Sequence, residues 1–126
     1  YAGAFPLWLA PTQVVILPIS EKFLEYALKV KKQLDVSSIR NEIDLDNKSL
    51  GAKIRHSTLQ KVPYMIIIGE KEIRSKNITL RVRNGNQIVT TVTQFIEELE
   101  SKLKEYPKIP QHLPALISKQ ININSL

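Results

Sequence analysis

Cysteine is absent from this chain of 126 residues, and other residue types that build reactive sites are scarce. Without cysteine there is no disulfide framework, thiolate zinc site or cysteine nucleophile. Glycine occurs four times at scattered positions, so no glycine-rich phosphate loop is present. The two histidines, His56 and His112, have no further histidine or cysteine at ligand spacing, and no metal site is expected. Catalysis by this chain alone is therefore not expected.

Charge is missing from residues 1–20, and residues 93–126 balance four Lys/Arg against four Asp/Glu. The net charge of +6 therefore arises mainly between Val36 and Val92. A local basic excess indicates a polyanionic partner, because phosphate neutralisation supplies affinity. No apolar run reaches the roughly 18 residues of a membrane helix, so no membrane partner is expected. Because cysteine is also absent, we expect a cytoplasmic location.

The length fits one domain, and the pattern of apolar residues predicts an α/β fold. Short apolar or alternating runs, typical of strands, occur at residues 13–19, 38–44, 64–68, 78–83 and 87–92. The first three strands are expected to be parallel, because segments with helical spacing separate them. Asn84 and Gly85 join the last two runs and predict an antiparallel hairpin. The sheet should therefore be mixed.

Three helices are expected between or after these strands. Ser20 is a good N-cap for the first helix. Asn47 is the expected N-cap of the second helix, which ends before Pro63. Thr91 or Thr93 is the expected N-cap of the third helix. Beyond Tyr106, three prolines occur and no period is visible, so residues 107–126 are expected to wrap the domain or to be mobile.

Polar side chains follow the predicted strands at one edge of the sheet. Asn47 follows the second strand, and Lys71, Glu72 and Arg74 follow the third. Ligands of open α/β sheets bind at the carboxyl ends of parallel strands. Amide, carboxylate and guanidinium groups there can read the edges of unstacked bases. A surface of ordinary salt bridges is the alternative interpretation of the same residues.

Four motifs, in order and at matching spacing, resemble the threonyl-tRNA synthetase family. They are FPLWLAPTQVV at residues 5–15, DLDN with LGAKIR at residues 44–55, QKVPYM running into GEKE at residues 60–72, and RVR at residues 81–83. The resemblance covers roughly residues 5–106 and lies in the anticodon-binding domain of these enzymes. The string WLAP at residues 8–11 distinguishes the family from its relatives.

The resemblance implies a three-layer α/β domain with a mixed five-stranded sheet and three helices. Residues 1–12 would be the end of a catalytic domain and a linker, residues 13–106 the anticodon-binding domain, and residues 107–126 a C-terminal tail. A longer parent would be a threonine–tRNA ligase that uses ATP and zinc in its catalytic domain and forms a homodimer. The fragment itself would carry no cofactor, have no ligase activity and be monomeric.

The resemblance also implies which residues bind the anticodon of threonine tRNA. Carried over by position, they are Asn47, Arg55, Glu72 and Arg81. The candidates for phosphate contacts are Lys53, Lys61, Lys71 and Arg83. Asp46 and Lys48 flank Asn47 where the family usually has arginine and glutamate, so the local charges are reversed.

Three other functions are compatible with the fold. A prolyl, glycyl or histidyl enzyme would use the same domain to read a different anticodon, and a panel of tRNAs separates these cases. A synthetase-like protein-interaction domain would bind protein without anticodon preference. An enzyme with a small-molecule site at the strand ends lacks support from any catalytic motif.

Overall fold

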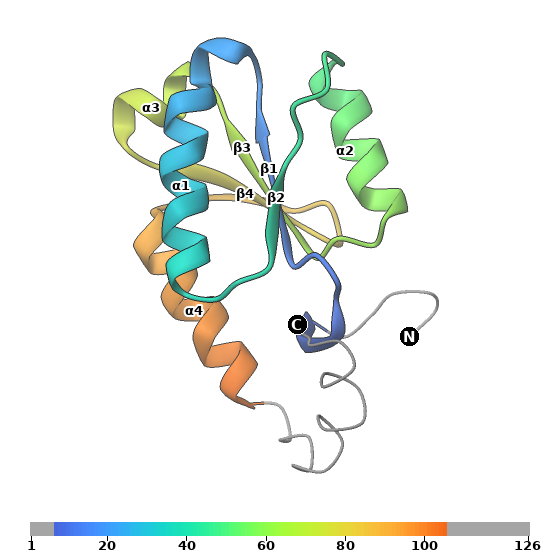
Figure 1. Cartoon of the computed structure of the whole chain (residues 1–126), viewed down its shortest axis with the longest axis vertical. Coiled ribbons are helices and arrows are strands. Elements are labelled where there is room, and N and C mark those ends of the chain that lie inside the picture. Colours follow the sequence, from blue (N-terminus) through green and yellow to red (C-terminus); the bar gives the residue numbers. More distant parts are fainter. Residues whose placement is uncertain (1–6, 106–126) are drawn as a thin grey trace.

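A five-stranded mixed sheet forms the centre of the computed structural model, which describes residues 7–105 (Figure 1). Its order is β2-β1-β3-β4-β5. The strands are β1 (Val14–Pro18), β2 (Asn41–Ile43), β3 (Tyr64–Ile68), β4 (Ile78–Val82) and β5 (Gln87–Thr90). β2 and β3 both pair with β1 in parallel, and β4 is antiparallel to β3 and β5. The predicted mixed topology and hairpin are confirmed.

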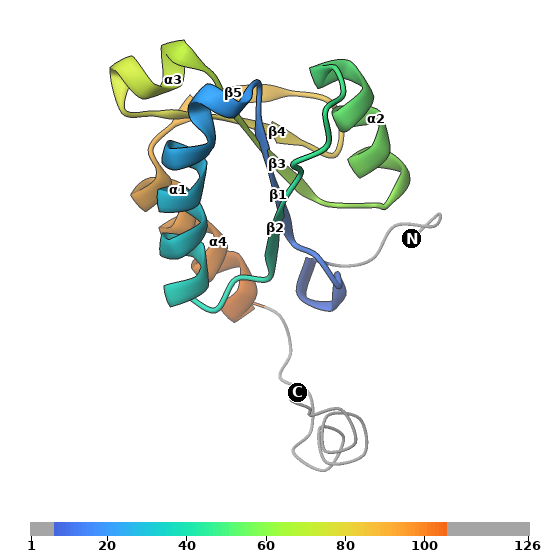
Figure 2. The ribbon, with the colours of Figure 1, turned by 45° about the horizontal axis from the view of Figure 1, so that its top comes forward.

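Helices cover both faces of the sheet and give three layers (Figure 2). The first face carries α1 (Leu24–Val36), which follows a short 3₁₀ helix at Glu21–Phe23, and α4 (Val92–Glu105). The opposite face carries α2 (Leu50–Leu59). A further helix, α3 (Glu70–Ser75), connects β3 to β4 and adds to the three that were predicted.

The core consists of two apolar clusters, one on each face of the sheet. Because side chains alternate along a strand, Ile16 and Ile66 pack toward α1 and α4, whereas Leu17 and Ile67 pack toward α2. Every residue of β1 is buried, which explains its continuous apolar sequence. The sheet is therefore held rigidly at β1 and β3, and each strand end is fixed in space.

Two details of the predicted elements were wrong. The N-cap of α2 is Ser49, whose hydroxyl accepts a hydrogen bond from the Ala52 amide, so Asn47 is left in the preceding loop. The second strand spans three residues because Ser38, with a φ of 59°, still belongs to the turn that follows α1. The predicted cap Thr91 is confirmed, since its hydroxyl accepts from the Gln94 amide. Ser20 caps the 3₁₀ helix at Glu21–Phe23, and the N-cap of α1 itself is Phe23.

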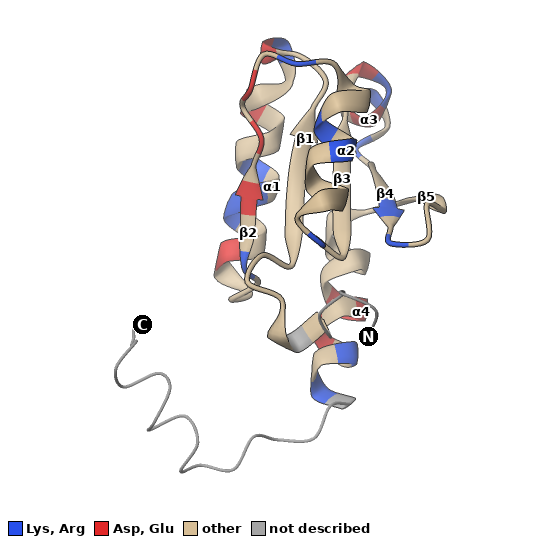
Figure 3. Ribbon diagram, turned by 90° about the vertical axis from the view of Figure 1, so that its right-hand side faces the viewer, with Lys and Arg blue, Asp and Glu red and all other residues tan. Residues whose placement is uncertain are grey.

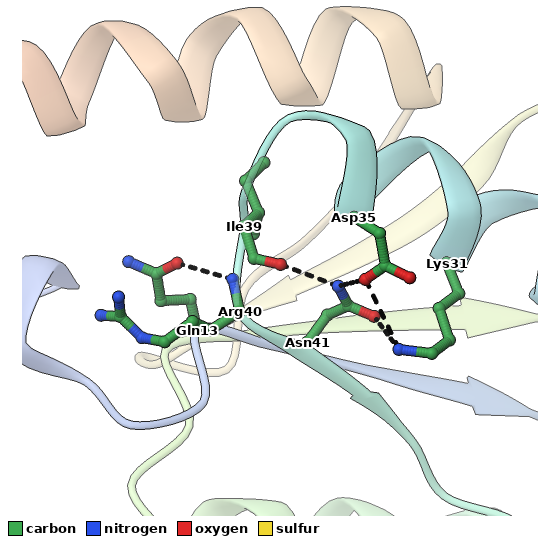
Figure 4. A network of polar contacts seen from close by, with 6 residues as sticks. All are labelled: Gln13, Lys31, Asp35, Ile39, Arg40 and Asn41. Carbon is green, nitrogen blue, oxygen red and sulfur yellow. Dashed lines mark hydrogen bonds and ion pairs between the residues drawn. The ribbon is translucent and has the colours of Figure 1, made fainter. Parts of the chain in front are cut away.

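Gln13 and Arg40 join residues 7–13 to the start of β2, and Figure 4 shows the bond from the Arg40 amide to the Gln13 side chain. Gln13 is 2% exposed; its side chain donates to the Leu7 carbonyl and accepts from the Arg40 amide. The Arg40 guanidinium donates twice to the Ala10 carbonyl, at 3.0 and 2.8 Å. The part of the predicted linker that the structure describes thus packs against the domain. Residues 1–6 and the predicted tail 107–126 lie outside the described residues.

In residues 7–105, no helix is long and apolar enough to cross a membrane.

Candidate functional site

Glu72 is fixed at the carboxyl end of β3, in the first turn of α3. Its Oε1 accepts a hydrogen bond from the Gly69 amide at 2.8 Å, and its Oε2 accepts from the Thr79 hydroxyl at 2.7 Å. The first bond belongs to a capping box, which is a signature of helix N-termini. Each oxygen keeps further lone pairs, so the carboxylate is held in one orientation and can still accept from a ligand.

Close packing at Gly69 brings the ends of β1 and β3 together beside this carboxylate. A Cβ at position 69 would lie 2.7 Å from the Ile19 Cδ1 atom and 3.2 Å from the Glu72 Oε1 atom. Ile19 itself is 47% exposed although it follows a fully buried strand. It offers an apolar surface to a ligand at this edge. This exposure could not be predicted from the sequence, because Ile19 continues the apolar run of β1.

Arg81 lies on the same face of β4 as Thr79, the partner of Glu72. Thr79 pairs with Ile67 and Arg81 with Met65, and both of these β3 residues pack beneath α2. Directly paired residues share a face, so Thr79 and Arg81 are on the α2 side of the sheet. Both remain partly exposed, because α2 covers β1 and β3. Glu72, Thr79 and Arg81 thus form a continuous polar stripe along β4.

Asn47 is exposed and lines a small cavity of about 70 Å³ at the carboxyl end of β1. Ile19 also lines this cavity and packs at Gly69, the residue whose amide donates to the Glu72 carboxylate. The structure therefore places Asn47 and Glu72 at the same edge of the sheet, as predicted. Asn47 is flanked by a salt bridge of 3.6 Å between Asp46 and Lys48.

Lys53 is not an exposed phosphate contact, and the prediction of that role needs correction. Its side chain points to the sheet and is 5% exposed. The ammonium donates to the Pro18 carbonyl at 3.2 Å and to the Asp44 carbonyl at 3.4 Å. Lys53 thereby ties the end of β1 to the loop that carries Asn47. Its position on the inner face of α2 gives it this structural role, which a count of charges does not reveal.

The structure does not bring Arg55 to the stripe. Arg55 is exposed and lines a hollow with Ser49 and Leu59, whereas the sheet side of α2 carries Lys53 and Ser57. The small cavity that Asn47 lines and the hollow that Arg55 lines have no lining residue in common. Among the four predicted base-binding residues, Glu72 and Arg81 lie on the stripe, Asn47 lines the cavity at the end of β1, and Arg55 lines a separate hollow on α2.

The remaining phosphate candidates are exposed but lie at opposite ends of the stripe. Lys71 is in α3, next to Glu72. Lys61 precedes β3, and Arg83 follows β4 in the hairpin turn, so both lie at the edge where β3 begins. Arg83 lies outside β4, which ends at Val82, although the strand was expected to extend through residue 83. A polyanion that contacts all three must extend along β4.

The charge of the sheet differs between its two sides (Figure 3). Lys and Arg occur on α2, α3 and β4, whereas Asp and Glu mark β2 and the loop after it. Near the stripe, burial and the Glu72 charge raise the pKa of Tyr26, whose hydroxyl donates to the Asn77 carbonyl. Through this hydrogen bond Tyr26 supports the start of β4.

The stripe combines fixed hydrogen-bond acceptors with a cationic donor. A planar ring with both N–H and carbonyl groups on one edge would satisfy Glu72 and Arg81 together. Ile19 adds an apolar contact at the same place. Among the described residues, no three His, Cys, Asp or Glu side chains converge as a metal site requires. The arrangement is suited to recognition.

Comparison with known proteins gives one family and one fold. Residues 13–106 match the model of the anticodon binding domain family. The chain is 46% identical over 112 residues to a threonine–tRNA ligase of Clostridioides difficile, covering 88% of this chain and 18% of the relative. It is 40% identical over 116 residues to the threonine–tRNA ligase of Staphylothermus marinus, covering 91% of this chain and 19% of the relative. The chain thus spans about a fifth of the curated relatives that it matches.

Solved structures give the same result. The RNA binding domain of threonyl-tRNA synthetase from Cryptosporidium parvum superposes with a TM-score of 0.75 and 38% identity, over 79% of this chain and 26% of the other. Histidyl-tRNA synthetase from Nostoc superposes with a TM-score of 0.69 at 23% identity, over 74% of this chain and 23% of the other. The second likeness concerns the fold alone.

Proposed function

The chain belongs to the anticodon-binding domain family, and from this premise we propose that it holds the anticodon of threonine tRNA. The observation that carries the proposal is the stripe of Glu72, Thr79 and Arg81 on the open face of β4. In it a carboxylate is held by two hydrogen bonds beside a partly exposed arginine. The similarity to threonine–tRNA ligases supports the choice of tRNA.

Specificity requires contacts to base edges, because phosphate contacts carry no sequence information. The central base of a threonine anticodon is guanine, which presents N–H donors and a carbonyl acceptor. Glu72 accepts from the donors, and Arg81 donates to the carbonyl. Asn47 can satisfy both a donor and an acceptor on the neighbouring uridine. Arg55 supports the RNA backbone from the outer side of α2.

Binding of anticodon stem-loops tests the proposal directly. The wild-type protein is titrated with a labelled threonine stem-loop, with the same loop carrying adenine at the centre, and with prolyl, glycyl and histidyl loops. We expect the threonine loop to bind most tightly, because adenine places an amino donor where Arg81 needs a carbonyl. Equal affinity for all five loops would contradict the proposal and favour a protein-interaction domain.

We assign the chemical steps of aminoacylation to the rest of a longer, cytoplasmic, homodimeric ligase. That part would supply ATP-dependent adenylate formation and any zinc site, and the domain described here would act as a monomeric RNA-binding unit. ATP–pyrophosphate exchange with threonine measures the first step. ATP–pyrophosphate exchange by the purified chain above a blank would contradict the assignment of catalysis to another part of the ligase.

A further inference from the structure

A second and larger cavity lies beside α2, at the β2 edge of the sheet. Its volume is about 420 Å³. Three carboxylates contribute to its lining, Glu42 on β2 and Asp44 and Asp46 in the loop that follows. Val15 and Val62, both buried, form apolar parts of the wall. The cavity is thus partly acidic and partly apolar, and Glu72 and Arg81 do not line it.

Ser57 provides an independent sign that this cavity accepts a ligand. It lies on the inner face of α2, lines the cavity and is 2% exposed. Its hydroxyl makes no hydrogen bond to any group in residues 7–105. A buried hydroxyl without a partner is costly, and native proteins usually satisfy such groups. A ligand that reaches the wall of the cavity would supply the missing hydrogen bond.

The charge of the cavity selects the class of ligand. The chain carries a net charge of +6, so cations are repelled on average and need a local acidic site to bind. Within the described residues, the carboxylates do not converge as ligands of one metal ion would. They are spread around a cavity that has apolar walls. This combination fits an organic cation with an aliphatic chain.

We propose that this cavity binds an aliphatic ammonium or guanidinium group. The methylene chain packs on Val15 and Val62, and the cationic end lies among Glu42, Asp44 and Asp46. One N–H of the ligand donates to the Ser57 hydroxyl. Two sources share this chemistry, a free small cation and a lysine or arginine side chain of a protein partner. Glu72 and Arg81 do not line this cavity, whereas Asp44, Leu45 and Asp46 line both it and the small cavity beside Asn47.

The experiment uses the whole chain and two probes, agmatine (an amine and a guanidinium joined by four methylenes) for a free small cation and N-acetyl-arginine amide for a protein side chain. Methyl resonances of Val15 and Val62 are followed by NMR during each titration. We expect saturable shifts with a Kd of about 0.1–5 mM for agmatine, in the range of very small ligands. Comparable affinity for the arginine amide would identify a protein side chain as the occupant, and weaker affinity would identify a free small cation.

Variants test whether the cavity itself is the site. Asp44→Asn keeps the acceptor that caps the Asp46 amide but removes the charge, and should weaken agmatine about three- to tenfold. Ser57→Ala should weaken it about two- to tenfold without lowering the thermal stability, because no internal hydrogen bond is lost. Asp35→Asn is the matched control: it removes the same charge at the C-terminal end of α1 and keeps the acceptor for Asn41.

Two results would overturn the proposal. The first is the absence of saturable shifts with either probe at about ten times the expected Kd. The second is an equal loss of affinity in Asp35→Asn and Asp44→Asn, which would mean that only the overall charge matters. Neither result concerns RNA, so the anticodon-binding proposal is tested separately.

Discussion

The two edges of the sheet carry opposite charge on one rigid frame. From Asn41 to Lys48, β2 and its following loop hold three acidic residues and one basic residue. From Glu70 to Arg83, α3 and β4 hold five basic residues and two acidic ones. Both edges are built on strands that pair directly with the buried strands β1 and β3. The fold therefore fixes where ligands approach, and the side chains fix which ligands do so.

Because the two edges differ in charge, a polyanion such as RNA is expected to bind at the β4 edge. RNA phosphates are attracted to the β4 edge by Lys and Arg and are repelled by the carboxylates of β2 and its loop, so Asn47 in that loop would contact a base and not a phosphate. Two carboxylates interrupt the basic edge: Glu70 pairs with Arg74, whereas each oxygen of Glu72 accepts a hydrogen bond from a neutral group. A negative charge in an RNA-binding surface costs affinity unless a base pairs with it. Under the proposed function, the guanine of the anticodon would be that base.

The largest effect is expected from Glu72→Gln. The amide oxygen can keep the hydrogen bond from Gly69, but the amide nitrogen faces the N–H donors of guanine. We expect affinity for the threonine stem-loop to fall about 10–100-fold, which corresponds to about 1.4–2.8 kcal/mol. Affinity for the adenine-substituted loop should change less. Titration of both loops with both proteins measures the difference.

Glu70→Gln is the matched control for this change. Glu70 is a neighbouring exposed carboxylate that pairs with Arg74 in the same helix. The Glu70→Gln substitution should leave the preference for guanine over adenine unchanged. If Glu72→Gln lowers both affinities by one common factor, Glu72 has only a structural role, and the assignment of base reading is wrong.

Arg81→Ala comes next in expected size. Loss of the guanidinium leaves the guanine carbonyl unpaired, and we expect a loss of about 5–50-fold for the threonine loop. Arg74→Ala removes an equal charge from the exposed side of α3 and should cost less. Fluorescence anisotropy at one salt concentration compares the two variants. Equal losses would show that Arg81 contributes charge alone.

Parts of this site follow from the sequence, and parts depend on packing. Asn47 and Glu72 were predicted at one edge because the carboxyl ends of parallel strands meet there, and the structure places both at that edge. The helix α3 was missed because six residues are too short to establish a helical period. The role of Lys53 was mistaken because charge usually implies exposure, whereas here two backbone carbonyls accept from the buried ammonium.

Lys53→Met tests that correction. Methionine fills a similar volume but leaves the Pro18 and Asp44 carbonyls without their donor. We expect the free energy of unfolding to fall by about 1–3 kcal/mol, and the salt dependence of RNA binding to remain unchanged. Chemical denaturation and a salt series measure the two quantities. Lys48→Met, at an exposed position in the same loop region, should change stability by less than about 0.5 kcal/mol.

The smallest effects are expected from single phosphate contacts, and they decide how far RNA extends along the basic edge. Lys71 lies beside Glu72, whereas Arg83 lies at the other end of β4. If RNA covers the whole stripe, Lys71→Ala and Arg83→Ala should each weaken all stem-loops a few-fold and lower the salt slope by about one. Lys32→Ala, on α1 at the opposite face of the sheet, should leave the slope unchanged.

A reduced slope for Lys71→Ala alone would confine the RNA to the α3 end, and Arg83 would then not be a phosphate contact. An unchanged slope in both variants would mean that the basic edge does not bind phosphate, and the contrast between the two edges would have no functional meaning.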